Sequence, residues 1–162
     1  MAQLILGIGD FGASKTSGDI IKTYGLGSCV AIVLLDPKTR TVGMDHVALP
    51  DSTIDAVKAE RLPGYFADTG IPALIKQMAD MGCDPLGRGF IVKLIGGASM
   101  LNAGDAFSIG KRNVLAIKKI LWKHRMGPKA EVVGGTCSRT VEVEVATGKV
   151  AVLSPQRTKQ YV

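Results

Sequence analysis

The chain has 162 residues, of which 46% are hydrophobic and 21% are charged, and its mean hydropathy is +0.23. These values exclude a disordered chain, and the length predicts a single domain over residues 1–162, because domains commonly span ~100–200 residues. Three cysteines are too few for a disulfide scaffold. Basic residues outnumber acidic ones by 20 to 14, so the net charge is +6 and an acidic partner is favoured.

The sequence predicts neither a targeting segment nor a membrane-spanning one. Its first ten residues, MAQLILGIGD, lack Lys and Arg, unlike a secretory signal peptide. The longest unbroken apolar run is Cys29–Leu35, far shorter than the ~20 residues that a spanning helix requires. We therefore expect no membrane insertion, a cytoplasmic location and reduced thiols.

The first part of the chain predicts short strands separated by turns. Asp10–Ser17 is rich in Gly and Ser and predicts a turn, and Asp36-Pro37-Lys38 is a second turn signal. The apolar, Val- and Ile-rich segments between such signals favour strands. The predicted strands are Ala2–Ile8, Ile20–Tyr24, Cys29–Leu35 and Thr41–Leu49.

Two main helices follow, after a polar segment from Asp51 to Arg61 whose pattern is ambiguous. The first helix is expected to be capped by Asp68 or Thr69, with Pro72 in its first turn and Gly82 at its end. The second is expected over Lys111–Met126. Its apolar side is predicted to carry Val114, Leu115, Ile117, Leu121 and Trp122.

The remaining strands complete an α+β pattern. They are predicted at Phe90–Ile95, Glu131–Val133, Thr140–Ala146 and Lys149–Leu153. Thr147-Gly148 predicts a hairpin between the last two strands. Val and Glu alternate in the strand before that turn, so one face of its sheet should meet solvent. Adjacent hairpins with two main helices favour α+β layers over a doubly wound sheet.

The predicted hairpin that begins at Cys29 places this cysteine near a histidine. If Leu35 lies opposite Val42, then Ala31 faces His46, and Cys29 becomes its diagonal neighbour on the same face, ~7–8 Å away between Cα atoms. A register in which Cys29 and His46 lie directly opposite would also bring their side chains together on one face. A slip by one residue would put them on opposite faces.

A thiol beside an imidazole is a recurrent arrangement for nucleophilic catalysis. A nearby imidazolium stabilises the thiolate, and the same ring can protonate a leaving amine and later activate water. Gly25 and Gly27 permit unusual backbone angles before the cysteine, and the N–H groups of Ser28 and Cys29 are candidate oxyanion donors. The alternative is a small buried cysteine beside a structural histidine.

Metal binding is not expected from the spacing of the possible ligands. Cys29, Cys83 and Cys137 are far apart in sequence, and no CxxC or HxxxH pattern is present. Neither glycine loop, Gly25-Leu26-Gly27-Ser28 or Gly96-Gly97-Ala98, matches a complete phosphate or dinucleotide fingerprint. We therefore expect no metal and no cofactor.

An ordered set of motifs resembles the chemoreceptor glutamine deamidase family, CheD. The likeness covers nearly the whole chain, and the order of the pieces makes it specific. The pieces are Thr23-Tyr24-Gly25-Leu26-Gly27-Ser28-Cys29-Val30, Gly43-Met44-Asp45-His46, Leu49-Pro50, Tyr65-Phe66-Ala67-Asp68, Lys93-Leu94-Ile95-Gly96-Gly97-Ala98-Ser99-Met100, Ile109-Gly110-Lys111-Arg112-Asn113-Val114, Gly134-Gly135, Arg139 and Thr147-Gly148.

The resemblance implies a layered α/β/β fold and a protein-glutamine glutaminase, an amidohydrolase that converts receptor glutamines to glutamate. It maps the nucleophile to Cys29, the histidine to His46 and a threonine to Thr23. The sequence departs from the family pattern at Asp45, which should point to the opposite strand face, and at Ser138, in a peripheral loop.

The partners implied by the resemblance are the cytoplasmic helices of methyl-accepting chemotaxis receptors. Some family members also bind a CheC-type CheY-phosphate phosphatase, which nothing in this sequence indicates. The alternative function is a docking module without chemistry, which binds receptors or such a phosphatase. Nucleic-acid binding rests on the net charge alone and is not expected.

The second predicted helix lies in a strongly basic segment. Residues 106–130 contain seven Lys and Arg and no Asp or Glu. Lys119 and Lys123 are candidate docking residues for a glutamate-rich receptor surface, through electrostatic steering. The alternative is a solvated helix face whose charges serve solubility.

Overall fold

The computed structural model describes residues 2–99, 108–156 and 158–162. Met100 of the motif quoted above lies outside the described residues. The strands are β1 (Gln3–Leu6), β2 (Phe11–Ser14), β3 (Ile20–Leu26), β4 (Val30–Asp36), β5 (Thr41–Val47), β6 (Ile91–Gly96), β7 (Pro128–Val133), β8 (Arg139–Glu144), β9 (Val150–Leu153) and β10 (Lys159–Tyr161). The helices are η1 (Ser52–Ile54), α1 (Ala56–Arg61), η2 (Pro63–Tyr65), α2 (Ala67–Asp80) and α3 (Ile109–Lys123).

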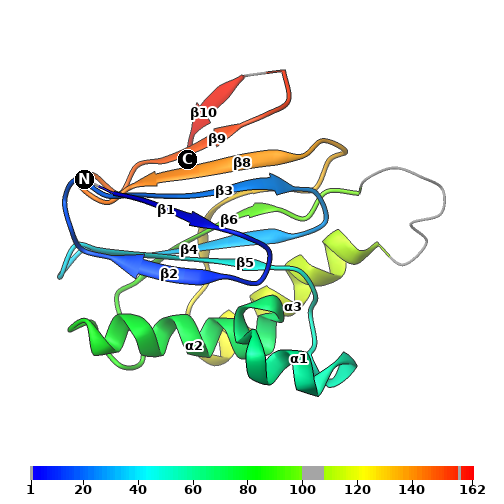
Figure 1. The fold of residues 1–162 in the computed structure, drawn as a ribbon, viewed down its shortest axis with the longest axis horizontal. Helices are drawn as coiled ribbons and strands as arrows, with labels where there is room; N and C mark the ends of the chain where they lie inside the picture. The colour runs from blue at the N-terminus through cyan, green and yellow to red at the C-terminus, as the bar shows by residue number, and fades with distance from the viewer. Residues whose placement is uncertain (1, 100–107, 157) are drawn as a thin grey trace.

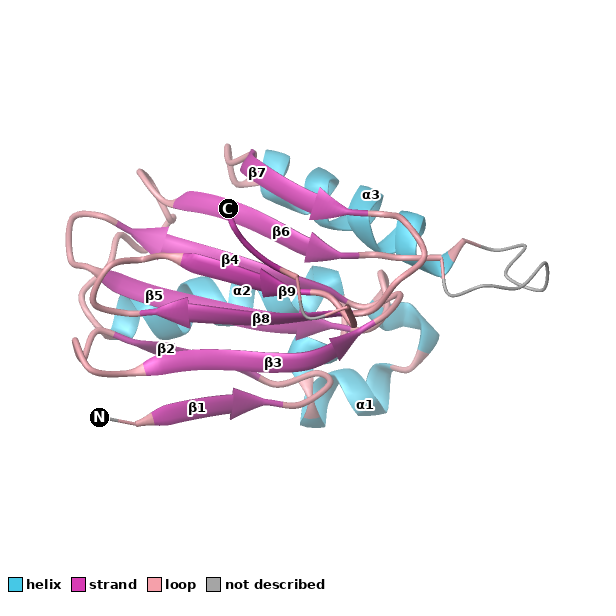
Figure 2. Cartoon of the chain, turned by 90° about the horizontal axis from the view of Figure 1, so that it is seen from above, coloured by secondary structure: helices cyan, strands magenta, loops and turns pink. Residues whose placement is uncertain are grey.

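These elements form three layers, two sheets and one layer of helices (Figure 1). The outer sheet has the order β1-β3-β8-β9-β10, and the middle sheet has the order β2-β5-β4-β6-β7. The helices cover the other face of the middle sheet, as Figure 2 also shows. Most strand pairs are antiparallel, and β1–β3 and β6–β7 are parallel. The predicted α+β fold with an α/β/β layering and two main helices is confirmed.

Two apolar clusters hold the layers together, one on each face of the middle sheet. Residues of β4 alternate between them: Ile32 and Leu34 pack under the helices, whereas Ala31, Val33 and Leu35 pack between the sheets. Every residue of β4 and β5 is buried, which explains why β4 reads as a continuous apolar run rather than an alternating one.

The structure corrects the predicted turn over Asp10–Ser17. Part of this segment is strand β2, which pairs with β5 and places Phe11 opposite Asp45. The sequence Phe-Gly-Ala-Ser contains only one strongly strand-favouring residue. The structure of β2 is therefore determined by its pairing with β5 and by the helices beneath it, and the local sequence pattern does not predict such tertiary effects.

The helix predictions need two corrections. Helix α2 begins at Ala67 after Phe66, so Pro72 lies beyond the first turn and neither Asp68 nor Thr69 is the cap. Asp68 instead accepts hydrogen bonds from the backbone N–H and the hydroxyl of Ser52. On α3, the predicted apolar face is too wide: Leu115 and Trp122, which were assigned to it, are 52% and 79% exposed.

The C-terminal segment contains strand β10, which the sequence pattern did not predict. Its residues are all exposed, so no apolar alternation marks it. It pairs with β9 at the edge of the outer sheet. No helix among the described residues has the length and apolar character needed to span a membrane.

Candidate active site

The β4–β5 hairpin sets the relation between Cys29 and His46. Leu35 pairs with Val42 and Ala31 with His46, which confirms the first of the predicted registers. Cys29 immediately precedes β4, is half-buried, and packs against the cluster between the sheets. His46 is 1% exposed and opposes Ala31, whose side chain belongs to that same cluster. Both side chains therefore belong to the layer between the sheets, at the same end of the hairpin.

Thr23 of the outer sheet contacts the imidazole and determines its tautomer. Its Oγ1 lies 2.7 Å from His46 Nδ1 and donates to the carbonyl of Leu6 at 2.8 Å. A hydroxyl has one hydrogen to donate, so toward the ring it acts as an acceptor, and Nδ1 carries the proton. His46 Nε2 is then the basic nitrogen. It is buried and has no hydrogen-bond partner among the described residues.

Burial shifts the pKa values of Cys29 and His46 in the directions that favour their neutral forms. It lowers the pKa of His46 to about 4, an effect that the nearby Asp10 only partly opposes. It raises the pKa of the Cys29 thiol above its ordinary value, although the backbone N–H of Cys29 acts in the opposite direction. The sequence predicts a thiolate stabilised by an imidazolium, whereas these shifts favour a neutral thiol and a neutral imidazole at rest. Such an imidazole can accept the thiol proton.

The loop before the nucleophile is fixed by hydrogen bonds to the second glycine loop. The N–H of Gly97 donates to the Cys29 carbonyl at 2.8 Å, and the N–H of Ala98 donates to the Gly27 carbonyl at 2.9 Å. Gly25 has φ +64°, a left-handed conformation that glycine adopts without strain. With these carbonyls engaged, the predicted oxyanion donors lie on a backbone that is held in place.

Asn113 completes this support, and sequence reasoning did not assign it a role. It is fully buried on α3, and its side-chain amide donates at 3.0 Å to the carbonyls of both Ser28 and Ala48. It therefore links the loop before Cys29 to the chain just after β5, which carries His46. The available signal was a polar residue four positions before Ile117, on the buried side of an amphipathic helix.

The structure does not bring the two candidate docking lysines to this site. Lys119 and Lys123 are exposed on α3, six and ten residues beyond Asn113, and a helix rises ~1.5 Å per residue. They therefore lie ~9 and ~15 Å further along the helix axis, toward the other end of the molecule. Lys119 and Lys123 can therefore act on a substrate only through long-range electrostatics, or by binding a partner long enough to reach from the active site along α3.

The other two cysteines lie elsewhere. Cys83 is buried, with its Sγ 3.3 Å from Thr39 Oγ1, and Cys137 is half-buried between β7 and β8. Within residues 2–99, 108–156 and 158–162, no group of three or more His, Cys, Asp or Glu side chains is arranged to hold a metal ion.

The two departures from the family pattern, Asp45 and Ser138, have different surroundings. Asp45 is fully buried on the helix-facing side of β5, where ideal Cβ atoms on Gly64 and Gly70 would come within 2.7 and 2.1 Å of its carboxylate oxygens. This placement agrees with the expected opposite face. Ser138 precedes β8, whose Arg139 donates to the Gly96 carbonyl at 3.1 Å.

Comparison with known proteins identifies the class to which this fold and site belong. A family model described as "CheD chemotactic sensory transduction" matches residues 48–154. The chain belongs to the CheD family.

Individual relatives match over nearly their whole lengths. The chain is 55% identical to the probable chemoreceptor glutamine deamidase CheD of Syntrophotalea carbinolica, over 97% of each chain. It is 44% identical to probable chemoreceptor glutamine deamidase CheD 1 of Syntrophus aciditrophicus, over 95% of each. A crystal structure of the Neisseria meningitidis protein NMB0706 has a TM-score of 0.42 and 14% identity, over 78% of this chain and 52% of that one.

Proposed function

We propose that this protein hydrolyses the side-chain amide of selected glutamines on chemoreceptors, which yields glutamate and ammonia. The observation that carries the proposal is the hydrogen bond between Thr23 and His46 Nδ1, which leaves Nε2 basic and unpartnered in the layer that also receives Cys29. Relatives named as chemoreceptor glutamine deamidases at 55% and 44% identity support the substrate class.

The reaction begins with proton transfer and acylation. Neutral His46 accepts the Cys29 proton at Nε2 while the sulfur attacks the carboxamide carbon, so a C–S bond forms and the C=O π pair moves onto oxygen. N–H groups of the Gly27–Ser28–Cys29 loop stabilise this oxyanion. When the oxyanion collapses, the C–N bond breaks and the proton on His46 goes to the nitrogen. Ammonia leaves, and a thioester remains.

Hydrolysis of the thioester uses the same groups in reverse. His46 takes a proton from water, hydroxide adds to the thioester carbon, and collapse breaks the C–S bond. The thiolate recovers the proton from His46, so the enzyme returns to its starting state and glutamate is released. Thr23 does not react; its hydroxyl keeps Nδ1 protonated and the ring oriented in every step.

The proposed partner is a helical receptor surface that is rich in glutamate, on the cytoplasmic side, where free thiols persist. Lys119 and Lys123 are proposed docking residues because both are exposed on a helix whose segment carries no acidic residue. Their distance from Cys29 assigns them to steering rather than to binding of the reacting glutamine. A CheC-type phosphatase is the second proposed partner.

The test is deamidation of a receptor cytoplasmic fragment, followed by ammonia release and by mass spectrometry for the ~1 Da gain per site that hydrolysis through a thioester produces. Cys29→Ala should abolish turnover, and His46→Ala should lower it by ~10²–10⁴-fold, the usual contribution of general acid–base catalysis. Cys137→Ala and His124→Ala are the matched controls and should retain wild-type rates.

Two outcomes would contradict this proposal. Turnover by Cys29→Ala with correct folding by circular dichroism would exclude a covalent intermediate on that sulfur. Receptor binding by the wild-type protein with no release of ammonia would instead establish a docking module without chemistry.

A further inference from the structure

The outward face of α3 carries two apolar side chains that the fold does not bury. Leu115 and Trp122 are seven residues apart in the sequence, about two helical turns, so they lie on one face of the helix. They are 52% and 79% exposed, and Trp122 is the most exposed large apolar side chain among the described residues. The buried side of α3 instead carries Val114, Ile117 and Leu121. Core packing therefore does not account for Leu115 and Trp122.

Exposed lysines accompany these two side chains. Lys119 precedes Trp122 by three residues, which places it on the same face of the helix, and Lys123 follows directly; both are exposed. Their neighbour Lys118 pairs with Glu131 at 2.7 Å, so this acid is engaged. Lys119 and Lys123 make no ion pair with the described acidic residues. The outward face of α3 is therefore cationic as well as apolar.

The basic surface continues around the C-terminal end of α3. Two hollows there both have Lys123 and Arg125 in their walls; Trp122 borders one hollow and Arg88 borders the other. Among the described residues, the side chains of Arg88, Lys123 and Arg125 form no ion pair. We refer to this surface as the α3 patch, which consists of Arg88, Leu115, Lys119, Trp122, Lys123 and Arg125.

The acidic residue that precedes Arg88 does not neutralise this patch. Asp84 accepts hydrogen bonds from the backbone N–H groups of Leu86 at 2.8 Å and of Arg88 at 3.3 Å, so its carboxylate holds its own loop. The segment that contains α3, residues 106–130, has no Asp or Glu. The charged members of the α3 patch are therefore all cations.

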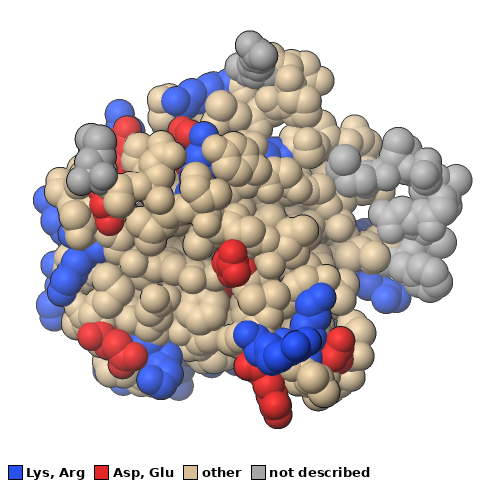
Figure 3. Space-filling view, viewed as in Figure 1, with Lys and Arg blue, Asp and Glu red and all other residues tan. Residues whose placement is uncertain are grey.

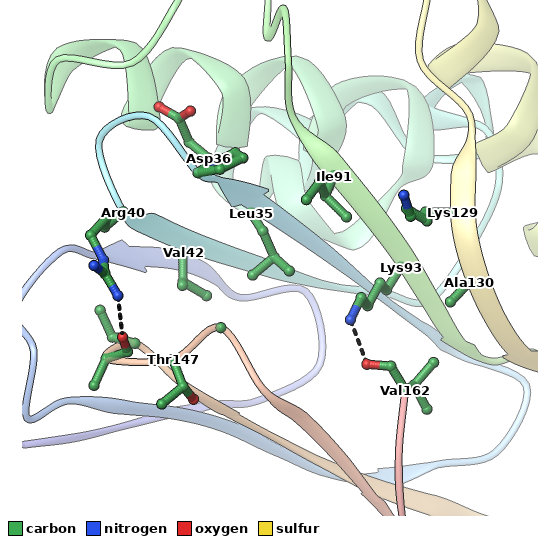
Figure 4. A pocket seen from close by; sticks show the side chains of 14 residues that line it. Leu35, Asp36, Arg40, Val42, Ile91, Lys93, Lys129, Ala130, Thr147 and Val162 are labelled. Atoms are coloured by element: carbon green, nitrogen blue, oxygen red, sulfur yellow. Dashed lines mark hydrogen bonds between the residues drawn. The ribbon is translucent and has the colours of Figure 1, made fainter.

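Basic side chains between the two sheets differ, because they have partners within the fold. Figure 4 shows a cavity there, in which Lys93 contacts an oxygen of Val162. Arg40, in the wall of the same cavity, donates to the carbonyl of Ala146 at 3.0 Å. The cations of the α3 patch are instead exposed to solvent, which leaves them available to an external anionic partner.

We propose that the α3 patch binds the surface of an anionic phospholipid bilayer. Trp122 and Leu115 enter the boundary between headgroups and acyl chains, while the four cations of the patch contact lipid phosphates. Tryptophan suits this boundary because its ring is apolar and its N–H is polar. A bilayer offers negative charge across its whole surface, which matches a patch whose charges are all positive. A protein surface of mixed charge would leave some of these cations opposite other cations.

Binding through this patch leaves the candidate active site open. Asn113 supports the loop before Cys29, and Trp122 lies nine residues further along α3, ~13 Å at 1.5 Å per residue. The protein would therefore be held at a membrane surface while Cys29 stays accessible. This inference goes beyond the proposed deamidation and does not depend on it.

The test uses Trp122 as its own reporter, because it is the only tryptophan in the chain. The full protein is titrated with vesicles of phosphatidylglycerol and phosphatidylcholine in equal parts, and with vesicles of phosphatidylcholine alone. The anionic vesicles should shift the Trp122 emission to shorter wavelength and bind about tenfold or more tightly than the neutral ones. The affinity for the anionic vesicles should fall as salt is added.

Co-sedimentation with the same vesicles measures the variants. Lys123→Gln/Arg125→Gln should weaken binding about fivefold for each charge removed, the equivalent of ~1 kcal/mol per cation. Trp122→Ala removes the apolar anchor and should also weaken binding. The matched control, Lys38→Gln/Lys159→Gln, removes the same net charge at exposed positions remote from α3 and should bind nearly as the wild type does.

Three outcomes would overturn the proposal: no emission shift with anionic vesicles, equal binding of neutral vesicles, or an equal loss in the two double variants. A Trp122 shift with polyglutamate but with neither kind of vesicle would assign the patch to an acidic polypeptide instead. None of these measurements contains a receptor fragment, so their result is independent of the deamidation assay.

Discussion

Thr23 shows how a single hydroxyl can set the chemistry of a neighbouring ring. It donates to Leu6 and accepts from His46 Nδ1, a role that in many hydrolases belongs to a carboxylate or an amide. A hydroxyl carries no charge, so it orients the imidazole without stabilising the imidazolium. This agrees with the low pKa of His46, about 4, and with a ring that is neutral at rest.

Replacing Thr23 by Val should lower kcat of deamidation while leaving KM unchanged. Valine keeps the shape of the side chain but leaves the His46 Nδ1–H and the Leu6 carbonyl unpaired, and a buried unpaired group costs ~1–3 kcal/mol. We expect a loss of about tenfold or more in ammonia release from a receptor fragment. Thr23→Ser restores the hydroxyl and should recover most of the rate. A wild-type kcat in Thr23→Val would show that the hydroxyl does not position the ring.

Asp45, adjacent to His46 in sequence, faces the helices instead of the active site. Both of its carboxylate oxygens are buried without a hydrogen-bond partner among the described residues. Burial raises the pKa of Asp45 well above its ordinary value, and the charge of Asp10 adds to that rise. The other acid near this end of α2, Asp68, has its carboxylate engaged by Ser52. Asp45 is therefore protonated in the folded protein under conditions where the unfolded chain has released the proton.

This difference makes stability depend on pH with a definite sign. The folded state binds more protons than the unfolded state, so the contribution of Asp45 is fully present below its unfolded pKa and is lost as pH rises toward its folded pKa. Asp45→Asn removes the titration and should melt several degrees higher than the wild type at pH 8, since ~1 kcal/mol shifts Tm by roughly 2–4 °C in a domain of this size. The advantage should shrink toward pH 4.

Thermal melts from pH 4 to pH 8 give the measurement. The control is Asp80→Asn, because Asp80 is exposed and pairs with Lys76 only at 3.5 Å. A wild type and an Asp45→Asn variant with parallel pH profiles would mean that Asp45 is ionised in the fold.

At the scale of elements, α3 acts as a brace for the active-site end of the hairpin. Gly110 lets its first turn approach the second glycine loop: an ideal Cβ there would lie 2.5 Å from the carbonyl oxygens of Gly97 and Ala98. One turn later, Asn113 donates to Ser28 and Ala48. One amide group thus binds two carbonyls that lie 85 and 65 positions away from Asn113 in the sequence.

Asn113→Ala should therefore lose activity and stability together. The buried Ala48 carbonyl and the part-buried Ser28 carbonyl lose their donor, and an unpaired buried group costs ~1–3 kcal/mol. We therefore expect a Tm lower by several degrees and ammonia release reduced about tenfold or more. The rate of Cys29 alkylation by iodoacetamide should also change, because the loop that holds the sulfur relaxes. Lys111→Ala, exposed two residues earlier, is the control. Normal turnover in Asn113→Ala would show that α3 does not position the loop before Cys29.

The elements that could be predicted from sequence are those whose local pattern and tertiary surroundings agree. The Cys29–His46 hairpin is one: a fixed turn and a strand period of two leave few registers, and the apolar residues select among them. Strand β2 is the opposite case, because Phe-Gly-Ala-Ser becomes a strand only through its pairing with β5. Asn113 escaped notice because its two acceptors, Ser28 and Ala48, are distant in sequence.

At the scale of the whole molecule, the positive charge is concentrated in one segment. Residues 106–130 hold seven of the 20 basic residues and no acidic ones, so the rest of the chain is nearly neutral. Figure 3 shows a face away from α3, where acidic and basic side chains are mixed around the rim and an acidic side chain stands near the centre. Within α3, Lys118 is paired with Glu131 at 2.7 Å, whereas Lys119 and Lys123 are exposed.

Reversing the charge of Lys119 and Lys123 together should therefore weaken encounter with a glutamate-rich receptor helix without altering the chemistry. Steering by exposed charges acts over a Debye length of ~10 Å at 0.1 M salt, so we expect the Lys119→Glu/Lys123→Glu variant to raise KM for a receptor fragment about tenfold at low salt, with the difference shrinking as salt is added. The alkylation rate of Cys29 should stay at the wild-type value.

A matched reversal at exposed positions remote from α3, Lys38→Glu with Lys159→Glu, makes the same change in net charge and should have a smaller effect. If both double variants change KM equally, net charge alone governs the encounter; if neither changes it at low salt, α3 is a solvated face and recognition lies in the rim around Cys29.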